Sequence, residues 1–400
     1  MTPLFPEDDE AADPRAADDH ATDHNAQSRA PASDESEDVA SALRLAMTPG
    51  IGPRLTVALL ERFGSAAGVL AAAPSELRAV QGVGPKLSQA IGRVATADVE
   101  AEIELCRRER VAILTPAGAG YPRMLREIHD PPPVLFARGS ITSKDSLAIA
   151  IVGSRHGTQY GLQQAERLAG SLARAGFTIV SGLARGIDAA AHRGALAAGG
   201  RTIAVLGSGV LSIYPPEHVE LAAEVAAAGA VISESPPRAQ PMTGAFPQRN
   251  RLISGLSLGV IVVEASNQSG ALITVRLAME QGREVFAVPG RVDNRMAHGC
   301  HRLIRDGAKL VETAEDVLEE LGPLVEATSA AEGPAVHHPA ELLLNEIERQ
   351  VLDVIGSEST TVDHVVAASG LPTPQVLATL SVLEMRRLVR RASGNSIARV

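Results

Sequence analysis

The stretch LAIAIVGSRHGTQYG, residues 147–161, decides the fold of the central part of the chain. Its first six residues form an uninterrupted apolar run, which is typical of a strand buried on both faces of a sheet. Gly153 and two further glycines then allow a tight turn into a helix. In that turn, free backbone amides, the Ser154 hydroxyl and the Arg155 guanidinium converge on a space that suits an anion. The stretch therefore predicts a strand, a turn and a helix that together grip a phosphate group.

The same alternation continues to about residue 321. Short β-branched apolar runs, which we interpret as strands, alternate with alanine-rich stretches that are typical of helices. The expected strands are LAIAIV, FTIV, TIAVL, AVIS, LGVIVV, EVFAV and AKLV. This alternation indicates an α/β fold with a doubly wound, mostly parallel sheet.

Ligands of such sheets bind beyond the carboxyl ends of the strands, so the residues that follow each run are candidates for a site. The second strand ends in SGLAR, the third is preceded by an arginine and followed by GSG, and the fourth leads into FPQRNR. Glycines let a backbone approach closely, and arginines bind phosphate. We therefore predict that one edge of the sheet binds a partner with several phosphates along a line and at least one base. The candidate residues are Gly153, Ser154, Arg155, Gly182, Arg201, Phe246, Arg249, Asn250 and Arg251.

Motifs for enzymes and cofactors are weak by comparison. The spacing GSRHGTQYG differs from the dinucleotide fingerprint G-x-G-x-x-G, and no Walker A ending occurs. Asp188 and His192 are interpreted as a structural pair on one helix, and Cys300 followed by a histidine as a packed helix start. Neither Ser154 nor Glu264 completes a catalytic set. We expect no catalytic residues, no cofactor and no metal.

The formal net charge of −10 argues at first against a polyanionic partner. The acidity is local, however, because residues 1–38 contain 12 of the 47 acidic residues and only 2 of the 37 basic ones. The rest of the chain carries 35 residues of each sign, so arginine clusters can still form positive sites there. Aromatic residues make up only 2% of the chain, which leaves few platforms for base stacking.

Residues 1–38 have almost no large apolar side chains and are predicted to form a disordered acidic tail. The tail either deters nonspecific contact with DNA or is a dispensable solvated segment. The chain has only two cysteines, lacks a secretory signal and contains no run of about 18 apolar residues. We therefore expect a cytoplasmic protein without a membrane span.

Residues 39–105 are predicted to form a helical domain. Its phrases TPGIGPRLTVALLERFG and VQGVGPKLSQAIG each place Gly-apolar-Gly-Pro before a helix, as in a helix-hairpin-helix or SAM-like element. The amides at such a helix start can hold a phosphate, but the same hairpins also suit packing in a protein-binding module, and both interpretations stay open. The residues available for secondary phosphate contacts are Gly50, Gly52, Arg54, Gly82, Gly84 and Lys86.

Three further segments complete the predicted organisation. Residues 106–321 hold a connector with three consecutive prolines followed by the sheet domain, and residues 322–340 are a flexible linker. Residues 341–400 are expected to form a winged-helix-like domain of three helices and a β wing. Its third helix, TPQVLATLSVLEMRRL, has Gln375 and Thr379 but basic residues only at its end. A contact with another protein is therefore at least as consistent with this helix as recognition of bases in a DNA groove.

A series of phrases between about residues 40 and 320 resembles the bacterial DNA-processing protein A family, called DprA or Smf. The phrases occur in the order typical of the family: IVGSRHGTQYG, SGLARGIDAAAHRGAL, TIAVLGSGV, YPPEH, FPQRNRLISGLS, VVEASNQSGALITVRLAMEQGREVFAVPG and LIRDGAKLV. The resemblance assigns Gly153, Ser154 and Arg155 to the signature phosphate loop. It places Arg201 at a basic position that is often Lys, and it matches Phe246 and the following residues to the Phe-x-x-Arg-Asn phrase.

The resemblance implies an extended Rossmann-like core that binds single-stranded DNA without catalysis. It also implies a homodimer that protects incoming DNA and helps to load RecA recombinase during natural transformation. We expect the dimer to use helices near residues 270–282 or 298–306.

Two other classes of protein remain as alternatives. One is an enzyme, a nucleotide phosphoribohydrolase of the lysine-decarboxylase-like Rossmann group, whose hallmark Pro-Gly-Gly-x-Gly-Thr is replaced here by residues 264–270, EASNQSG. The other is an adaptor that acts only through protein contacts.

Overall fold

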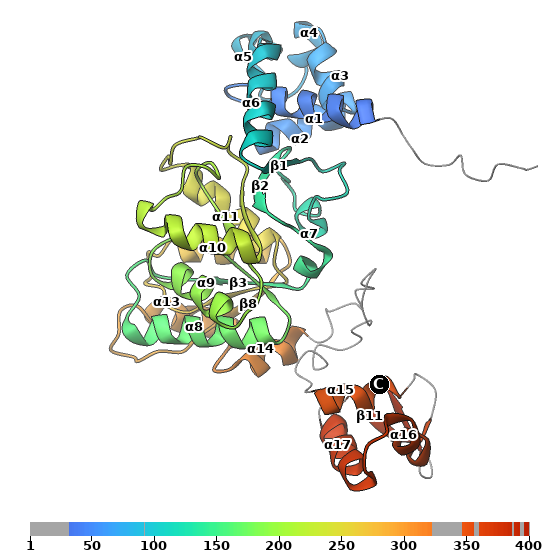
Figure 1. Ribbon diagram of the computed structural model, residues 1–400. Coiled ribbons are helices and arrows are strands. Elements are labelled where there is room, and N and C mark those ends of the chain that lie inside the picture. The colour runs from blue at the N-terminus through green and yellow to red at the C-terminus, as the bar shows by residue number, and fades with distance from the viewer. Residues whose placement is uncertain are drawn as a thin grey trace, which may run out of the picture.

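The chain forms a helical domain, a large α/β domain and a small C-terminal domain (Figure 1). The computed structural model describes residues 32–91, 93–321, 346–355, 360–385, 388–392 and 396–399. The predicted linker at residues 322–340 and most of the predicted acidic tail lie outside these ranges.

A nine-stranded sheet with the order β1-β2-β6-β5-β4-β3-β7-β8-β9 forms the centre of the α/β domain. The seven strands from β3 to β9 pair in parallel with one another. They are β3 (Ala148–Val152), β4 (Thr178–Ser181), β5 (Thr202–Val205), β6 (Ala230–Ser233), β7 (Gly259–Val262), β8 (Glu284–Ala287) and β9 (Lys309–Leu310). All seven strands expected from the alternating sequence pattern are present, which confirms the doubly wound α/β fold.

Two antiparallel strands that the sequence interpretation missed extend one side of the sheet. These are β1 (Val111–Leu114) and β2 (Leu135–Gly139), and β2 in turn pairs antiparallel with β6. Residues 106–146 were expected to be an extended connector because of their three prolines, residues 131–133. The prolines lie between β1 and β2, so they interrupt neither strand.

The winding of the chain reverses at β3, which pairs with β4 on one side and with β7 on the other. In a doubly wound sheet, such a reversal leaves a crevice beyond the carboxyl ends of the strands. The turns that follow β3, β4, β5 and β7 therefore open along the same edge of the sheet. We call this edge the rim; it comprises residues 153–158, 182–186, 206–210 and 264–270.

Helices cover both faces of the sheet (Figure 1). Side chains alternate along β7, so that Val260 packs under one helix layer and Ile261 under the other. The first layer contains α11 (Ala245–Gly255), α12 (Ala271–Glu280) and α13 (His298–Arg305). The second contains α8 (Gln159–Arg174), α9 (Ile187–Ala197), α10 (Val219–Ala228) and α14 (Ala314–Leu321).

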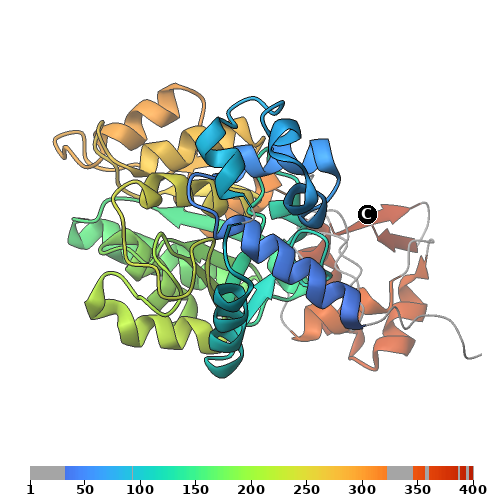
Figure 2. The same ribbon diagram turned by 90° about the horizontal axis from the view of Figure 1, so that it is seen from above.

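The helical domain lies at the end of the sheet that carries β1 and β2 (Figures 1 and 2). It consists of α1 (Ala32–Ala46), α2 (Pro53–Phe63), α3 (Ala66–Ala71), α4 (Pro74–Leu77), α5 (Pro85–Ala90) and α6 (Thr96–Arg108). Leu43 of α1 and Val99 of α6 share one apolar cluster with Phe136 of β2. This shared core attaches the helical domain to the sheet.

Helix α1 begins at Ala32, inside the segment that was predicted to be disordered. The boundary placed at residue 38 is therefore wrong for the last residues of that segment.

The C-terminal domain has its own apolar core and a three-stranded sheet of order β10-β12-β11. Its elements are α15 (Glu346–Asp353), β10 (Thr360–Thr361), α16 (Val362–Ser369), α17 (Thr373–Met385), β11 (Val389–Ala392) and β12 (Ser396–Arg399). This arrangement confirms the predicted three helices and β wing, and residues 393–395, which join β11 to β12, lie outside the described residues.

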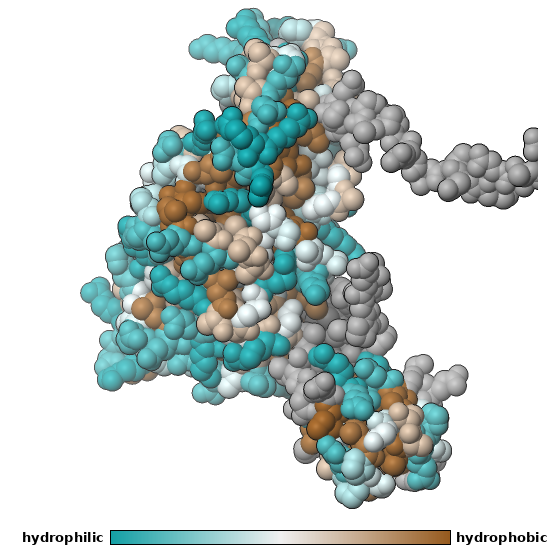
Figure 3. All heavy atoms as spheres, viewed as in Figure 1, coloured by the Kyte–Doolittle hydropathy of each residue, from teal (hydrophilic) through white to brown (hydrophobic). Residues whose placement is uncertain are grey.

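On the face of the α/β domain that Figure 3 shows, hydrophobic residues gather in the middle and hydrophilic residues lie along the lower edge. Within the described ranges, no single helix is long and apolar enough to cross a membrane. Among the residues that the structure describes, one bent pair, α16 with Thr373–Glu384 of α17, passes the same test by length and composition alone.

Candidate nucleic-acid interface

A small pocket of about 30 Å³ lies at the rim, where the turns after β3 and β4 meet the start of α11. We call it the rim pocket. It is lined by Arg155, Gly182, Ala184, Arg185, Tyr214, Pro215, Phe246 and Arg249. Four of the predicted site residues, which come from two turns and helix α11, therefore meet at one place: Arg155, Gly182, Phe246 and Arg249.

The loop that carries Arg155 is anchored by hydrogen bonds to Glu264, a buried residue just after the end of β7. The Thr158 amide donates to Glu264 Oε2 (2.7 Å) and the Thr158 hydroxyl donates to Oε1 (2.6 Å). Thr158 Oγ1 also accepts a hydrogen bond from the Gly161 amide (3.2 Å) and so caps α8. The carboxylate thus fixes the loop to the start of α8. Glu264 therefore positions the loop that carries Arg155.

Two features bring the neighbouring turns close to this loop. Ser154 Oγ accepts a hydrogen bond from the His156 amide (3.1 Å), which closes a tight turn. Gly186 has a φ of 76°, and a Cβ there would lie 2.8 Å from the carbonyl carbon and oxygen of Arg155. A side chain at position 186 would therefore push the turn after β4 away from the loop after β3.

Arg155 is exposed and stacks on an aromatic pair. Its guanidinium carbon lies 5.6 Å from the centroid of the Phe246 ring, and that ring lies 5.7 Å from the ring of Tyr214. Tyr214 is 39% exposed. A cation beside exposed aromatic faces can bind a phosphate and stack an unpaired base at once. Tyr214 was not among the predicted site residues, although an aromatic in YPPEH is a signal in a chain so poor in aromatics.

Arg249 forms the buried back of the rim pocket. Its Nη1 donates to the carbonyl oxygens of Gly182 (2.8 Å) and Val205. Burial lowers the pKa of Arg249 to about 10, and the nearby carboxylate of Asp188 opposes that shift. The guanidinium therefore remains positive at neutral pH. Asp188 accepts hydrogen bonds from the amides of Gly182 (3.1 Å) and Ala184 (3.3 Å), so it orders the turn after β4.

Three segments of the chain match models of known protein families. Residues 112–322 match the family described as DNA recombination-mediator protein A. Residues 334–395 match the DprA winged helix domain, and residues 42–92 match the SAM-like helix-hairpin-helix tandem. The chain belongs to the DprA/Smf family.

Individual relatives agree with this assignment. The chain is 36% identical over 378 residues to the protein Smf of Synechocystis, which covers 86% of this chain and 94% of the relative. It is 49% identical to the DNA processing protein DprA of Bacillus subtilis, over 50% of this chain and 68% of the relative. The X-ray structure of DNA processing protein A from Streptococcus pneumoniae superposes with a TM-score of 0.64 at 35% identity, over 70% of this chain and 97% of that one.

In this member of the DprA/Smf family, Asn250 and Arg251 do not line the rim pocket, contrary to the sequence-based expectation. Arg251 is 4% exposed and forms ion pairs with Asp130 (3.5 Å) and Glu234. Asn250 Nδ2 donates to the carbonyl oxygen of Gly270 (3.5 Å). The reason is that these residues lie on α11, where consecutive side chains point about 100° apart, and not on an extended segment.

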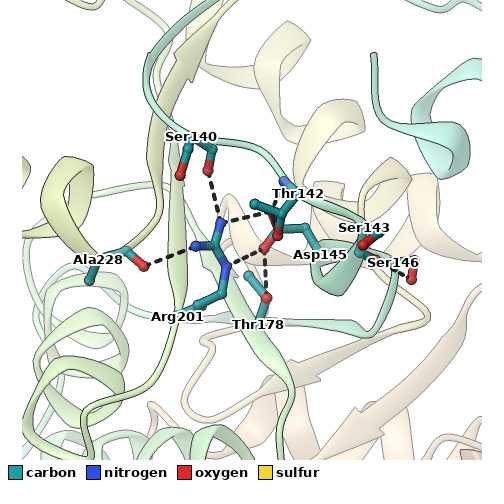
Figure 4. A network of polar contacts seen from close by, with 8 residues as sticks. All are labelled: Ser140, Thr142, Ser143, Asp145, Ser146, Thr178, Arg201 and Ala228. Carbon is teal, nitrogen blue, oxygen red and sulfur yellow. Dashed lines mark hydrogen bonds and ion pairs between the residues drawn. The ribbon is translucent and has the colours of Figure 1, made fainter. Parts of the chain in front are cut away.

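Arg201 is also separated from the rim, because it precedes β5 and so lies at the amino ends of the parallel strands. Figure 4 shows its guanidinium bound to the carboxylate of Asp145, with distances of 3.0 Å from Nε and 2.9 Å from Nη2. Nη2 also donates to the Ser140 carbonyl oxygen (2.8 Å), and Asp145 accepts from the Thr178 hydroxyl (2.8 Å). The placement of Arg201 on the shared rim was therefore wrong: its contacts tie the segment before β3 to the sheet.

The two hairpins of the helical domain have the expected glycine turns. Gly50 has a φ of 92° and Gly82 a φ of 96°, a region that favours glycine. Arg54 and Lys86 are exposed in the first turns of α2 and α5. Neither N-cap residue, Gly52 or Gly84, offers a side chain to the first-turn amides.

The polar groups considered for catalysis serve the packing of the α/β domain. His192 is fully buried, and its Nδ1 lies 2.7 Å from the Thr202 hydroxyl. The Cys300 thiol lies 3.6 Å from the carbonyl oxygen of Val262, while His301 Nε2 lies 2.9 Å from that of Gly290. Within the described part of the chain, no group of three or more His, Cys, Asp or Glu residues is placed to hold a metal ion.

Proposed function

We propose that the chain binds single-stranded DNA at the rim pocket and does so without catalysis. The observation that carries the proposal is the stack of Arg155, Phe246 and Tyr214 in front of the buried Arg249. Two guanidinium groups favour a phosphate, and exposed aromatic faces favour an unpaired base. The contacts are to features that every nucleotide shares, so little sequence preference is expected.

Membership of the DprA/Smf family supports a place in the processing of incoming DNA. We propose that the chain protects such DNA and helps to load RecA recombinase onto it, in the cytoplasm. Assembly of RecA on a single strand coated with single-strand-binding protein, followed with and without this chain, tests the loading step. An unchanged rate of assembly would count against it.

A homodimer is part of the same proposal. The outer sides of α12 and α13 are available for it, because both helices bury their inner sides in the same core under the sheet. Met279 on α12 is 66% exposed and gives that surface an apolar centre. Sedimentation of the chain at micromolar concentration should show a dimer, and Met279→Glu should shift it toward the monomer.

The experiment that best tests the binding is a salt titration with single-stranded and double-stranded DNA of equal length. If about four phosphates are neutralised, the logarithm of the affinity should fall with the logarithm of the salt concentration with a slope near −3, because each phosphate of a single strand contributes about −0.7. Equal affinity for both DNAs, or an affinity independent of salt, would contradict the proposal.

The phosphoribohydrolase alternative gains no support from the site. Glu264, which occupies the place of the hallmark motif of those enzymes, is engaged by Thr158 and lies 3.4 Å from Asn294 Nδ2. A carboxylate that already accepts these hydrogen bonds is poorly available as a general base. Incubation with nucleoside monophosphates should release no free base.

A further inference from the structure

A second cavity, of about 250 Å³, lies between the helical domain and the rim. One wall is the first hairpin of the helical domain, including Ile51, Gly52 and Pro53. The other wall includes Gly207 in the turn after β5, Gln248 and Arg249 of α11, and Glu234, whose carboxylate is paired with Arg251. We call this space the hairpin cavity. Because Arg249 also lines the rim pocket, the two sites are adjacent.

The start of α2 forms the part of the hairpin cavity that suits a phosphate. Gly52 is the N-cap and Pro53 the first helical residue, so no side chain accepts hydrogen bonds from the amides of the first turn. Such amides, together with the positive end of an 11-residue helix, attract an anion. Arg54, which is exposed in the same turn but does not line the cavity, adds a positive charge nearby.

Arg249, which lines both the rim pocket and the hairpin cavity, has hydrogen-bonding capacity that the described residues do not use. Its side chain is largely buried, with 5% of the residue exposed. Its Nη1 is held by two carbonyl oxygens, but its buried Nε has no hydrogen-bond partner among the described residues. A buried guanidinium with unused donor capacity is costly unless a ligand or water completes it.

We propose that the hairpin cavity is a second nucleotide subsite for the strand that occupies the rim pocket. The strand passes Arg249, one unpaired base enters the cavity against Ile51 and Pro53, and its phosphate rests on the first turn of α2. A paired base carries its partner with it, and the pair does not fit a cavity of about 250 Å³. This inference rests on the proposed binding of single-stranded DNA at the rim.

The second hairpin provides a matched control, because it has the same Gly-apolar-Gly-Pro sequence before a helix but lies away from the hairpin cavity. Gly84 is the N-cap of α5 and does not line the hairpin cavity. Both N-cap glycines have a negative φ, −101° at Gly52 and −84° at Gly84. A Cβ at either position would meet no heavy atom within 4 Å. Aspartate fits both sites and is a favourable N-cap, so neither substitution should unfold its helix.

The test compares Gly52→Asp and Gly84→Asp in the full chain. At position 52 the new carboxylate occupies the first-turn amides and repels a phosphate. The affinity for oligodeoxythymidines of increasing length is measured at several salt concentrations, with Arg155→Ala as a reference for the rim. Thermal melting checks that each variant is folded.

We expect Gly52→Asp to weaken the binding of long oligonucleotides about tenfold, the effect of one lost charge-assisted contact. Its salt slope should become shallower by about 0.7, which corresponds to one phosphate. The shortest oligonucleotide that still binds fills only the rim pocket, so its affinity should not change. Gly84→Asp adds the same charge outside the hairpin cavity, so it should weaken the binding of long oligonucleotides less than Gly52→Asp does.

Three outcomes would overturn the inference. If Arg155→Ala weakens binding but Gly52→Asp does not, the rim binds DNA and the hairpin cavity is not a subsite. If Gly52→Asp weakens all lengths equally, or Gly84→Asp acts as strongly, the effect is general repulsion. If the unmodified chain binds no single strand, the proposed function and this inference fail together.

Discussion

The guanidinium of Arg155 stacks on the ring of Phe246, although the strands that precede the two residues, β3 and β6, are separated in the sheet by β4 and β5. Arg155 follows β3, whereas Phe246 lies in the first turn of α11. Their contact gives the rim pocket both a charge for phosphate and a face for a base. The following predictions test what each part of this arrangement contributes.

Arg155→Ala should weaken the binding of single-stranded DNA across all sequences, because it removes a backbone contact and not a base-specific one. The salt slope should become shallower by about 0.7. Arg174→Ala is the control, since Arg174 is exposed at the opposite end of α8. Fluorescence anisotropy with labelled oligonucleotides measures both; equal affinities for the two variants would remove Arg155 from the site.

Tyr214→Ala should lower the affinity for single-stranded DNA by about 1 to 3 kcal/mol, the range found for the loss of one stacking platform. Tyr214→Phe retains the ring and should bind as well as the unmodified chain. A loss in the phenylalanine variant would mean that the hydroxyl, and not the stacked face, makes the contact.

Glu264→Gln should loosen the phosphate loop, because an amide cannot accept hydrogen bonds at both of its polar atoms. Each carboxylate oxygen of Glu264 now accepts one from Thr158. Leaving one such buried group unpaired costs about 1 to 3 kcal/mol. We expect a lower melting temperature and weaker DNA binding, and a double-mutant cycle with Thr158→Ala should show that the two changes are not additive.

Arg201→Ala should destabilise the α/β domain and leave the rim unchanged. The substitution leaves the Asp145 carboxylate, whose side chain is 4% exposed, without its bidentate partner. The cost is about 3 kcal/mol, in line with breaking other buried ion pairs. Chemical denaturation measures the stability, and DNA titration of the folded variant measures binding. If the variant is folded but binds DNA more weakly, Arg201 contributes to DNA binding after all.

Acidification should destabilise the fold through His192. Burial lowers the pKa of His192 from 6.5 to about 3. Between these values the unfolded chain therefore binds one proton more than the folded chain, so the stability falls as the pH falls. The contribution is about 1.4 kcal/mol per pH unit, or about 2 kcal/mol at pH 5. His192→Gln cannot titrate, and its melting temperature should decline less between pH 7 and pH 5.

The sequence by itself determined the seven parallel strands, the three folded domains and the glycine turns of the rim and hairpins. These features depend on local periodicity and on backbone freedom, which neighbouring residues encode. It also predicted that Arg155 and Gly182 lie close together, because parallel strands end at one edge of the sheet.

Only the tertiary structure decided where the remaining side chains point. Arg249 faces the rim pocket and Arg251 faces Glu234, because they lie on a helix whose residues rotate about the axis. Arg201 lies at the other end of its strand, against Asp145. The hairpin cavity likewise exists only because the helical domain packs on the sheet. Contacts between segments far apart in the chain produce no local sequence pattern from which such a cavity could be predicted.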